Sequence, residues 1–266
     1  DALMACLEGD DLAAERSPVR EAVVRIGDAA VPRLAAALQS SSSRETASAA
    51  ALILGELRRT QHARAIVDAM QRGQIPAAIG LRALALLGDR TALPAVLELL
   101  ESPSAAVRRS AIDAASELLD PAEPEGTAVD PIAMQLVAPR LTPAESVALC
   151  GLLGRTGSPR AAAVLMSLAA AKDRTVRLSA IRALGDVGAA GQETLLLERL
   201  TDGDPEVRLQ ASMSLGRVAG DAGARGLLSR LSVASEQDRA ALGIAFSGAM
   251  SRARSEDLPA KAVALL

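Results

Sequence analysis

The side chains best suited to chemistry are few in this chain. His62 is the only histidine, and Cys6 and Cys150 are the only cysteines and lie far apart in the sequence. A zinc or redox-metal site needs several His or Cys ligands at short spacings. A Ser-His-Asp triad would have to use His62, which lies in a polar linker where we expect an exposed residue at a helix start. These residues predict no metal, no cofactor and no catalytic histidine.

Two further stretches superficially suit catalysis or phosphate binding. Glu123 and Glu125 lie in a predicted loop, which does not hold two carboxylates in the fixed geometry that acid–base catalysis requires. The segment GLLGRTG at residues 151–157 is rich in glycine, but no Lys-Ser/Thr pair follows it. Helix packing and helix termination account better for these glycines. The sequence therefore predicts a protein that is not an enzyme.

Composition restricts the fold class. Half of the residues are hydrophobic, yet there is no Trp, no Tyr and a single Phe246. An apolar content supplied mainly by Ala and Leu favours helices that pack through small side chains over a sheet rich in aromatic and β-branched residues. We therefore expect an all-α fold.

Charge and cysteine content restrict partners and compartment. The net charge of -3 gives no bulk attraction to nucleic acid or to an anionic membrane. No apolar run reaches the roughly 18 residues that a membrane span needs. Two cysteines define no disulfide framework, so a reducing cytoplasm is the expected location. The sequence predicts neither a nucleic-acid partner nor membrane insertion.

The chain repeats itself with a period of about 31 residues. The segments AKDRTVRLSAIRALGDVGA and DGDPEVRLQASMSLGRVAG, which begin at residues 171 and 202, align without gaps. A fixed period in this range indicates a repeat architecture. With Val207 as the anchor, the equivalent positions are Val19, Thr46, Pro76, Val107, Glu145, Val176, Val207 and about Gln237.

Each repeat predicts two helices. The second helix begins at a capping residue, which precedes proline in Ser17-Pro18, Thr142-Pro143 and Asp204-Pro205. Ser43, Ser104 and Asp173 occupy the same relative place. Apolar residues then recur at helical spacing. Glycines suited to a left-handed helix end follow at Gly27, Gly88, Gly157, Gly188 and Gly220.

The pattern D-x-x-V-R-x-x-A-x-x-x-L-G, at residues 173–185 and 204–216, resembles the HEAT repeat. It is most similar to the short bacterial variety called PBS-lyase-like HEAT repeats. Residues 104–108 and 17–20 match in part, whereas the repeats anchored at Thr46, Pro76 and Glu145 depart further. The resemblance implies a right-handed α-solenoid of about seven to eight helical hairpins, formed by a single array over residues 1–266.

Two features interrupt or end the predicted array. Residues 119–131, LDPAEPEGTAVDP, widen one repeat spacing to 38 residues and predict an inserted loop, which is either a partner contact or a tolerated surface insertion. The chain has no initiator Met and ends in the apolar run KAVALL. We therefore expect a segment of a larger array, or an open end that self-associates.

The resemblance implies that the second helix of each repeat lines a concave binding face. With the anchor as position zero, positions six and ten lie opposite the buried stripe. Their mixture of arginines, acids and apolar groups favours a protein partner, because a nucleic-acid groove needs a more uniform basic stripe. The candidate binding residues are Arg25, Leu52, Glu56, Arg82, Leu86, Asp113, Glu117, Arg155, Arg182, Met213 and Arg217.

A second set of residues has a predicted structural role. Asp173 and Asp204 cap helices, and Arg177 and Arg208 follow four positions later. We expect each arginine to pair with its aspartate and to stack one repeat on the next.

The sequence therefore predicts a scaffold or adaptor that holds another protein along its concave face. The alternative, implied by the family resemblance, is a bilin-lyase-like enzyme that binds a chromophore or its carrier protein and forms a visible-absorbing complex with added bilin. Nucleic-acid binding would show steep salt dependence, and the charge balance argues against it.

Overall fold

The structure, a computed structural model, describes residues 18–41, 43–138, 141–188, 192–255 and 258. Every element in these ranges is an α-helix or a short 3-10 helix, which confirms the all-α fold. Among the sequence-predicted features, Cys6, Ser17 and the apolar end at residues 261–266 lie outside the described residues.

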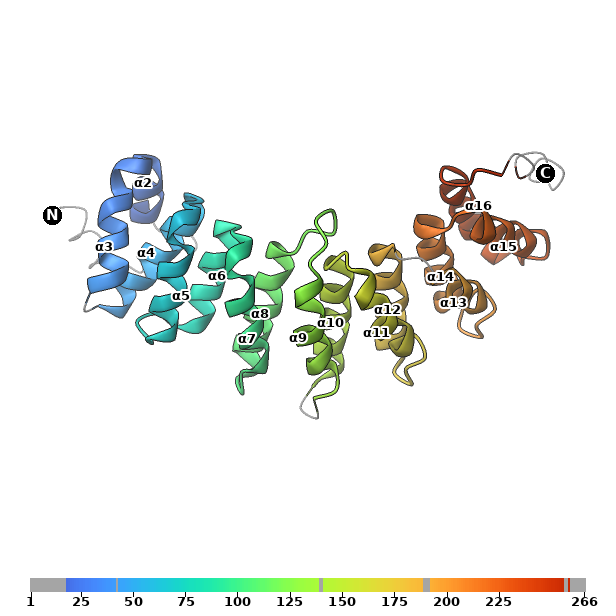
Figure 1. Ribbon diagram of the computed structural model, residues 1–266, viewed down its shortest axis with the longest axis horizontal. Helices are drawn as coiled ribbons and strands as arrows, with labels where there is room; N and C mark the ends of the chain where they lie inside the picture. The colour runs from blue at the N-terminus through green and yellow to red at the C-terminus, as the bar shows by residue number, and fades with distance from the viewer. Residues whose placement is uncertain (1–17, 42, 139–140, 189–191, 256–257, 259–266) are drawn as a thin grey trace. The chain divides into compact units, whose positions relative to one another are not determined.

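Helical hairpins follow one another along the chain and form two compact units, one up to Leu119 and one from Asp120 (Figure 1). The N-terminal unit contains α2 (Pro18–Ile26), η1 (Gly27–Ala30), α3 (Val31–Ser40), α4 (Arg44–Glu56), η2 (Thr60–His62), α5 (Ala63–Gln71), α6 (Ala77–Leu87), η3 (Arg90–Ala92), α7 (Leu93–Glu98), η4 (Leu99–Glu101) and α8 (Ala105–Leu118). The C-terminal unit contains η5 (Gly126–Ala128), α9 (Val129–Leu136), α10 (Pro143–Arg155), α11 (Pro159–Leu168), α12 (Arg174–Val187), α13 (Glu193–Arg199), α14 (Pro205–Val218), α15 (Asp221–Ser232) and α16 (Glu236–Met250).

Odd-numbered helices from α3 to α15 are the first helices of hairpins, and even-numbered helices from α4 to α16 are the second helices. Within the N-terminal unit α4 packs on α6 and α6 on α8, while α10, α12, α14 and α16 pack in succession within the C-terminal unit. Each first helix packs against its own second helix. The described residues thus form seven hairpins, in agreement with the predicted solenoid.

The second helices approach one another through a glycine at one repeat position. A Cβ added to Gly216 of α14 would lie 2.8 Å from the Cα of Ala245 in α16. A Cβ at Gly185 of α12 would lie 2.8 Å from the Cα of Ser214 in α14. Real Cβ atoms essentially never show contacts this short, so these positions require glycine for the backbones to come this close. Gly55 and Gly154 make the same kind of contact with Ala83 and Ala183.

The predicted helix caps are formed at Asp173, Asp204, Ser43 and Thr142. The Asp173 carboxylate accepts hydrogen bonds from the backbone N–H groups of Thr175 and Val176, at 2.8 and 3.1 Å. The Thr142 hydroxyl accepts from the N–H of Glu145 at 3.2 Å, and the Glu145 carboxylate accepts from the N–H of Thr142 at 3.0 Å, which is a capping box.

Two predicted helix ends differ from the structure. Ser104 precedes α8 without a side-chain cap. Gly88 and Gly188 end their helices with φ of 73° and 66° as predicted, but Gly220 has φ of -92° and begins α15. Gly220 has this role because its N–H donates to the Glu193 carboxylate, at 3.0 Å, where α15 starts.

The arginine that follows the anchor Val107, Val176 or Val207 binds backbone carbonyls of the loop before its own helix. Arg177 donates to the carbonyls of Ala171 and Lys172 at 2.8 and 3.3 Å. Arg208 donates to the carbonyls of Asp202 and Gly203 at 3.0 and 3.4 Å, and Arg108 makes the equivalent bonds to residues 102 and 103. The guanidinium thus binds carbonyls in the turn between the first and second helix, which lie outside both helices and need partners of their own.

Ion pairs between carboxylates and guanidinium groups link successive repeats as expected, but the residues that pair differ from those predicted. Asp204 binds Arg174 of the preceding repeat, and Arg208 binds Asp238 of the following repeat at 3.3 Å. Neither aspartate forms an ion pair with the arginine four positions later, although the charge of Arg177 contributes to lowering the pKa of Asp173. The arginine turns back toward the loop carbonyls, and the aspartate turns toward the N-terminus of its own helix.

The predicted loop at residues 119–131 is shorter than expected, since η5 and the start of α9 occupy its second half. It is also fastened to the turn between α10 and α11. The N–H of Glu125 donates to the carbonyl of Thr156 at 2.7 Å, and Arg160 binds the Asp130 carboxylate through two bonds of 2.9 and 2.8 Å. This segment is therefore an ordered part of the C-terminal unit.

The glycine contacts predict opposite effects of two similar substitutions. Gly216→Ala introduces a methyl group against the α16 backbone and should lower the free energy of unfolding by about 1–3 kcal/mol. Gly151→Ala lies on an exposed helix surface with nothing within 4 Å, and it should raise the free energy of unfolding by about 0.5–1 kcal/mol through helix propensity. Urea denaturation followed by circular dichroism measures both. Equal effects of the two substitutions would contradict the packing role of Gly216.

The cap at Asp173 predicts a pH-dependent contribution to stability. Hydrogen bonds from the Thr175 hydroxyl and from the Val176 N–H lower the pKa of Asp173 below its ordinary value of 3.8. The stabilisation is therefore complete above the unfolded pKa and is lost as pH falls through the lower folded pKa. The gap in urea midpoint between wild type and Asp173→Ala should be wide at pH 7 and should narrow below about pH 4.

The matched control for this measurement is Asp113→Ala, since Asp113 is an exposed aspartate in the middle of α8 that caps no helix. The difference in urea midpoint between wild type and Asp173→Ala could stay constant with pH, or Asp113→Ala could show the same pH dependence. Either result would show that the Asp173 cap does not cause the pH dependence.

Candidate binding surface on the second helices

The second helices present a solvent-exposed row at the predicted repeat positions. Arg25, Arg82, Asp113, Arg182 and Met213 are exposed at position six. At position ten Glu56, Glu117 and Arg217 are exposed, whereas Leu86 and Arg155 are half-buried.

Leu52 is a correction to the prediction, because its side chain is fully buried. All residues of α4 from Thr46 to Gly55 are buried, and α4 contacts α2, α3 and α6. The helix therefore has no exposed apolar anchor at this position. Four residues further on, Glu56 forms an ion pair with the buried Arg20 of α2, so its carboxylate has a structural role.

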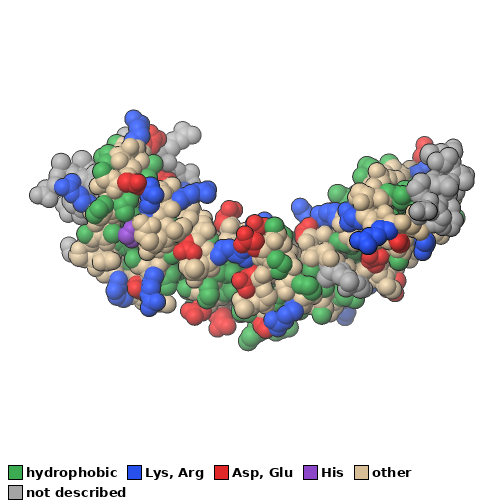
Figure 2. Space-filling view, turned by 45° about the horizontal axis from the view of Figure 1, so that its top comes forward, with side chains coloured by type: hydrophobic (Ala, Val, Ile, Leu, Met, Phe, Trp, Pro, Cys, Tyr) green, Lys and Arg blue, Asp and Glu red, His purple; other side chains and the backbone are tan. Residues whose placement is uncertain are grey.

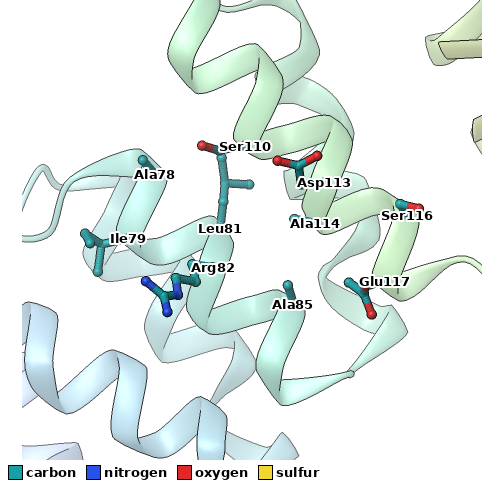
Figure 3. A pocket seen from close by; sticks show the side chains of 10 residues that line it. All are labelled: Ala78, Ile79, Leu81, Arg82, Ala85, Ser110, Asp113, Ala114, Ser116 and Glu117. Atoms are coloured by element: carbon teal, nitrogen blue, oxygen red, sulfur yellow. The ribbon is translucent and has the colours of Figure 1, made fainter. Parts of the chain in front are cut away.

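In the N-terminal unit three predicted residues surround one hollow. Arg82 of α6 and Asp113 and Glu117 of α8 line a hollow of about 570 Å³, shown in Figure 3. Small side chains, among them Ala85 and Ala114, form part of its lining. In this view the Arg82 guanidinium points away from both carboxylates. The two acids lie one turn apart on α8, so a partner reaching this hollow meets negative charge.

In the C-terminal unit the row is basic and apolar. Arg182 of α12, Met213 of α14 and Ile244 of α16 follow one another at intervals of 31 residues and occupy equivalent places on three successively packed helices. The exposed fractions of Met213 and Ile244 are 52% and 75%. Leu209, one turn before Met213, is 43% exposed. The apolar side chains of Leu209, Met213 and Ile244, on the two neighbouring helices α14 and α16, are therefore exposed to solvent.

Sequence reasoning missed Ile244 and Leu209. Extending the repeat to about Gln237 places position six at Gly243. In the structure Ser235 caps α16 by accepting from the N–H of Asp238, so Asp238 is the true equivalent of Val207. The 31-residue interval from Met213 is the signal that identifies Ile244.

An ion pair ties neighbouring second helices together along this row. Arg217 of α14 lies 2.9 Å from the carboxylate of Asp186 in α12, and it also donates to the carbonyl of Arg182 at 3.2 Å. The two side chains are 43% and 36% exposed, so the pair is screened by solvent and contributes little to stability. It fixes the position of the Arg217 guanidinium between α12 and α14.

Residues with catalytic potential lie elsewhere. His62 is half-buried at the end of η2 and makes no cap with its side chain. Cys150 is buried, and burial raises its pKa to about 12, so the thiol stays protonated at neutral pH. Within the described ranges no three His, Cys, Asp or Glu side chains gather as a metal ion requires. No helix in these ranges combines the length and apolar character needed to cross a membrane.

Comparisons with known proteins agree with this repeat architecture. A family model for HEAT repeats matches residues 141–216 and 173–247. No curated protein sequence matches the chain. Among solved structures, an engineered protein is 18% identical with a TM-score of 0.52, over 99% of this chain and 81% of its own.

Two natural proteins of known structure are also similar. The complex of CpcE and CpcF of phycocyanin lyase from Nostoc sp. PCC7120 is 22% identical with a TM-score of 0.46, over 88% of this chain and 92% of that chain. Human deoxyhypusine hydroxylase is 18% identical with a TM-score of 0.43, over 94% and 96%. Residues 141–247 thus match the family model for HEAT repeats, and the helical hairpins of this segment agree with that match.

Proposed function

We propose that the chain is a non-catalytic scaffold that holds another protein along the exposed row of its second helices. The observation that carries this proposal is the series Arg182, Met213 and Ile244, in which one repeat position stays solvent-exposed on three packed helices. Adjoining exposed apolar side chains are unfavourable in water and mark interaction sites. In stacked repeats such a series forms an extended recognition surface.

The charges of this row support a protein partner. In the C-terminal unit Arg155, Arg182 and Arg217 outnumber Asp186, while Asp113 and Glu117 make the hollow of the N-terminal unit acidic. Figure 2 shows basic, acidic and hydrophobic side chains intermingled at the surface. Nucleic-acid surfaces instead present a continuous basic stripe, often with aromatic groups for base stacking. Here the single Phe246 is buried.

The chemistry available along the row supports a non-catalytic role. Its side chains are arginines, carboxylates and apolar groups, and the buried Cys150 thiol is not a nucleophile at neutral pH. Binding energy would come from apolar anchors surrounded by arginine contacts, the usual composition of protein interfaces.

Affinity capture tests the scaffold. The wild-type chain and the double variant Arg82→Glu/Arg182→Glu serve as baits in lysate of the source organism, and mass spectrometry identifies retained proteins. We expect at least one protein to be retained by wild type and lost from the variant, because each substitution reverses the charge of an exposed arginine on the second helices and so disturbs charge complementarity with the partner.

The matched control bait is Arg33→Glu/Arg64→Glu, which makes the same change of charge at exposed residues of the first helices α3 and α5. It should retain the same protein as wild type. Circular dichroism must show equal helicity for all three baits. If both double variants lose the protein equally, or neither does, the row of second helices is not the binding surface.

A further inference from the structure

We infer that the apolar face of α14 and α16 docks an amphipathic helix of a partner protein, with a partner carboxylate bound to Arg182. This inference rests on the proposed scaffold function and specifies the chemistry of the occupant. The α14–α16 face is defined here as Leu209, Met213 and Ile244.

The three exposed side chains lie on two helices, α14 and α16, that pack closely against each other. Gly216 lies against Ala245, and a Cβ at Gly248 would lie 2.7 Å from the carbonyl oxygen of Gly216. Helices in contact are separated by about 8–10 Å, and glycine at the contact favours the short end of that range. Met213 and Ile244 occupy equivalent places on this pair.

A helix fits the spacing along α14. Leu209 and Met213 are four residues apart, so their side chains lie on one face about 6 Å from each other. Apolar residues at i and i+4 of a partner helix have the same spacing, and laying an amphipathic helix on an apolar surface is a common mode of peptide recognition.

The positive charge beside the α14–α16 face favours a partner with acidic side chains. The Arg182 guanidinium is exposed and has no hydrogen-bond or ionic partner among the described residues. Arg217, one turn after Met213 on α14, is held by Asp186. A guanidinium that is unpaired in the free protein gains a charge-assisted bond when a carboxylate arrives. A partner with glutamate or aspartate flanking its apolar stripe therefore complements this face, whereas a basic helix is repelled.

Methyl NMR observes the face directly. The probe is a synthetic helical peptide with Leu at i, i+4, i+7 and i+11 and Glu along both flanks, and the matched peptide has Lys in place of Glu. The protein carries methyl-labelled methionine, and Met213→Leu assigns the Met213 signal. Met134, which is 64% exposed on α9, is the internal control.

We expect the Glu peptide to shift the Met213 methyl signal saturably and to leave the Met134 signal in place. Arg182→Glu should weaken this binding at least about tenfold, since a charge-assisted hydrogen bond is replaced by repulsion. Ile244→Ser should weaken it about as much through lost apolar contact. Arg33→Glu, with the same change of net charge in the N-terminal unit, should leave it unchanged.

The inference is overturned if the Lys peptide shifts Met213 as strongly as the Glu peptide, if neither peptide shifts it, or if Arg182→Glu and Arg33→Glu act alike. A Met213 signal that moves with protein concentration alone would also overturn it, because the face would then be covered by a second copy. If capture finds a partner on the row but the Glu peptide leaves Met213 unmoved, the scaffold function stands and this occupant is rejected.

Discussion

The close approach of successive second helices is the constraint on which the rest of this structure depends. Gly185 and Gly216 meet the backbones of Ser214 and Ala245, and no side chain fits between them. Such contacts require small residues on both helices, which explains a core of Ala and Leu without Trp or Tyr. They also set the spacing of the repeats. Within each unit the packed second helices therefore carry their position-six residues at neighbouring places, and the exposed row of the second helices is a consequence of the packing.

Polar side chains form hydrogen bonds that hold the turn between the first and second helix of a repeat. Arg177 and Arg208 satisfy carbonyls of the turn before their own helix, while Asp173 and Asp204 satisfy the N–H groups at its start. Arg174 and Asp204 then link one repeat to the next, and their hydrogen bonds lower the pKa of Asp204 and raise that of Arg174. The recurring D-x-x-V-R pattern thus encodes local turn geometry and leaves the outer face of the helix free to vary.

The repeat pattern predicted the fold well because it reports what is common to all repeats. Period, caps and the buried stripe follow from 3.6-residue periodicity and from turn chemistry. The exposed row of the second helices was harder to predict, because exposure depends on the rotation of each helix about its axis and on the helices packed against it. A one-residue error in the α16 anchor moves position six from Ile244 to Gly243, a turn of about 100°. Leu52 was misplaced because α2 and α3 both pack on α4, which the pattern of α4 alone does not reveal.

Packing restricts the buried positions of the second helices and leaves the exposed positions free to differ between the two units. Buried residues of α6, α8 and α14 are mostly apolar or small, yet the exposed residue at position six is the acidic Asp113 on α8 and the apolar Met213 and Ile244 on α14 and α16. Exposing Met213 and Ile244 gains nothing for folding, since neither side chain is buried within its own unit. Exposed apolar side chains at equivalent places on two packed helices are typical of an interaction site, and this is the physical argument for the binding role that we propose for this face.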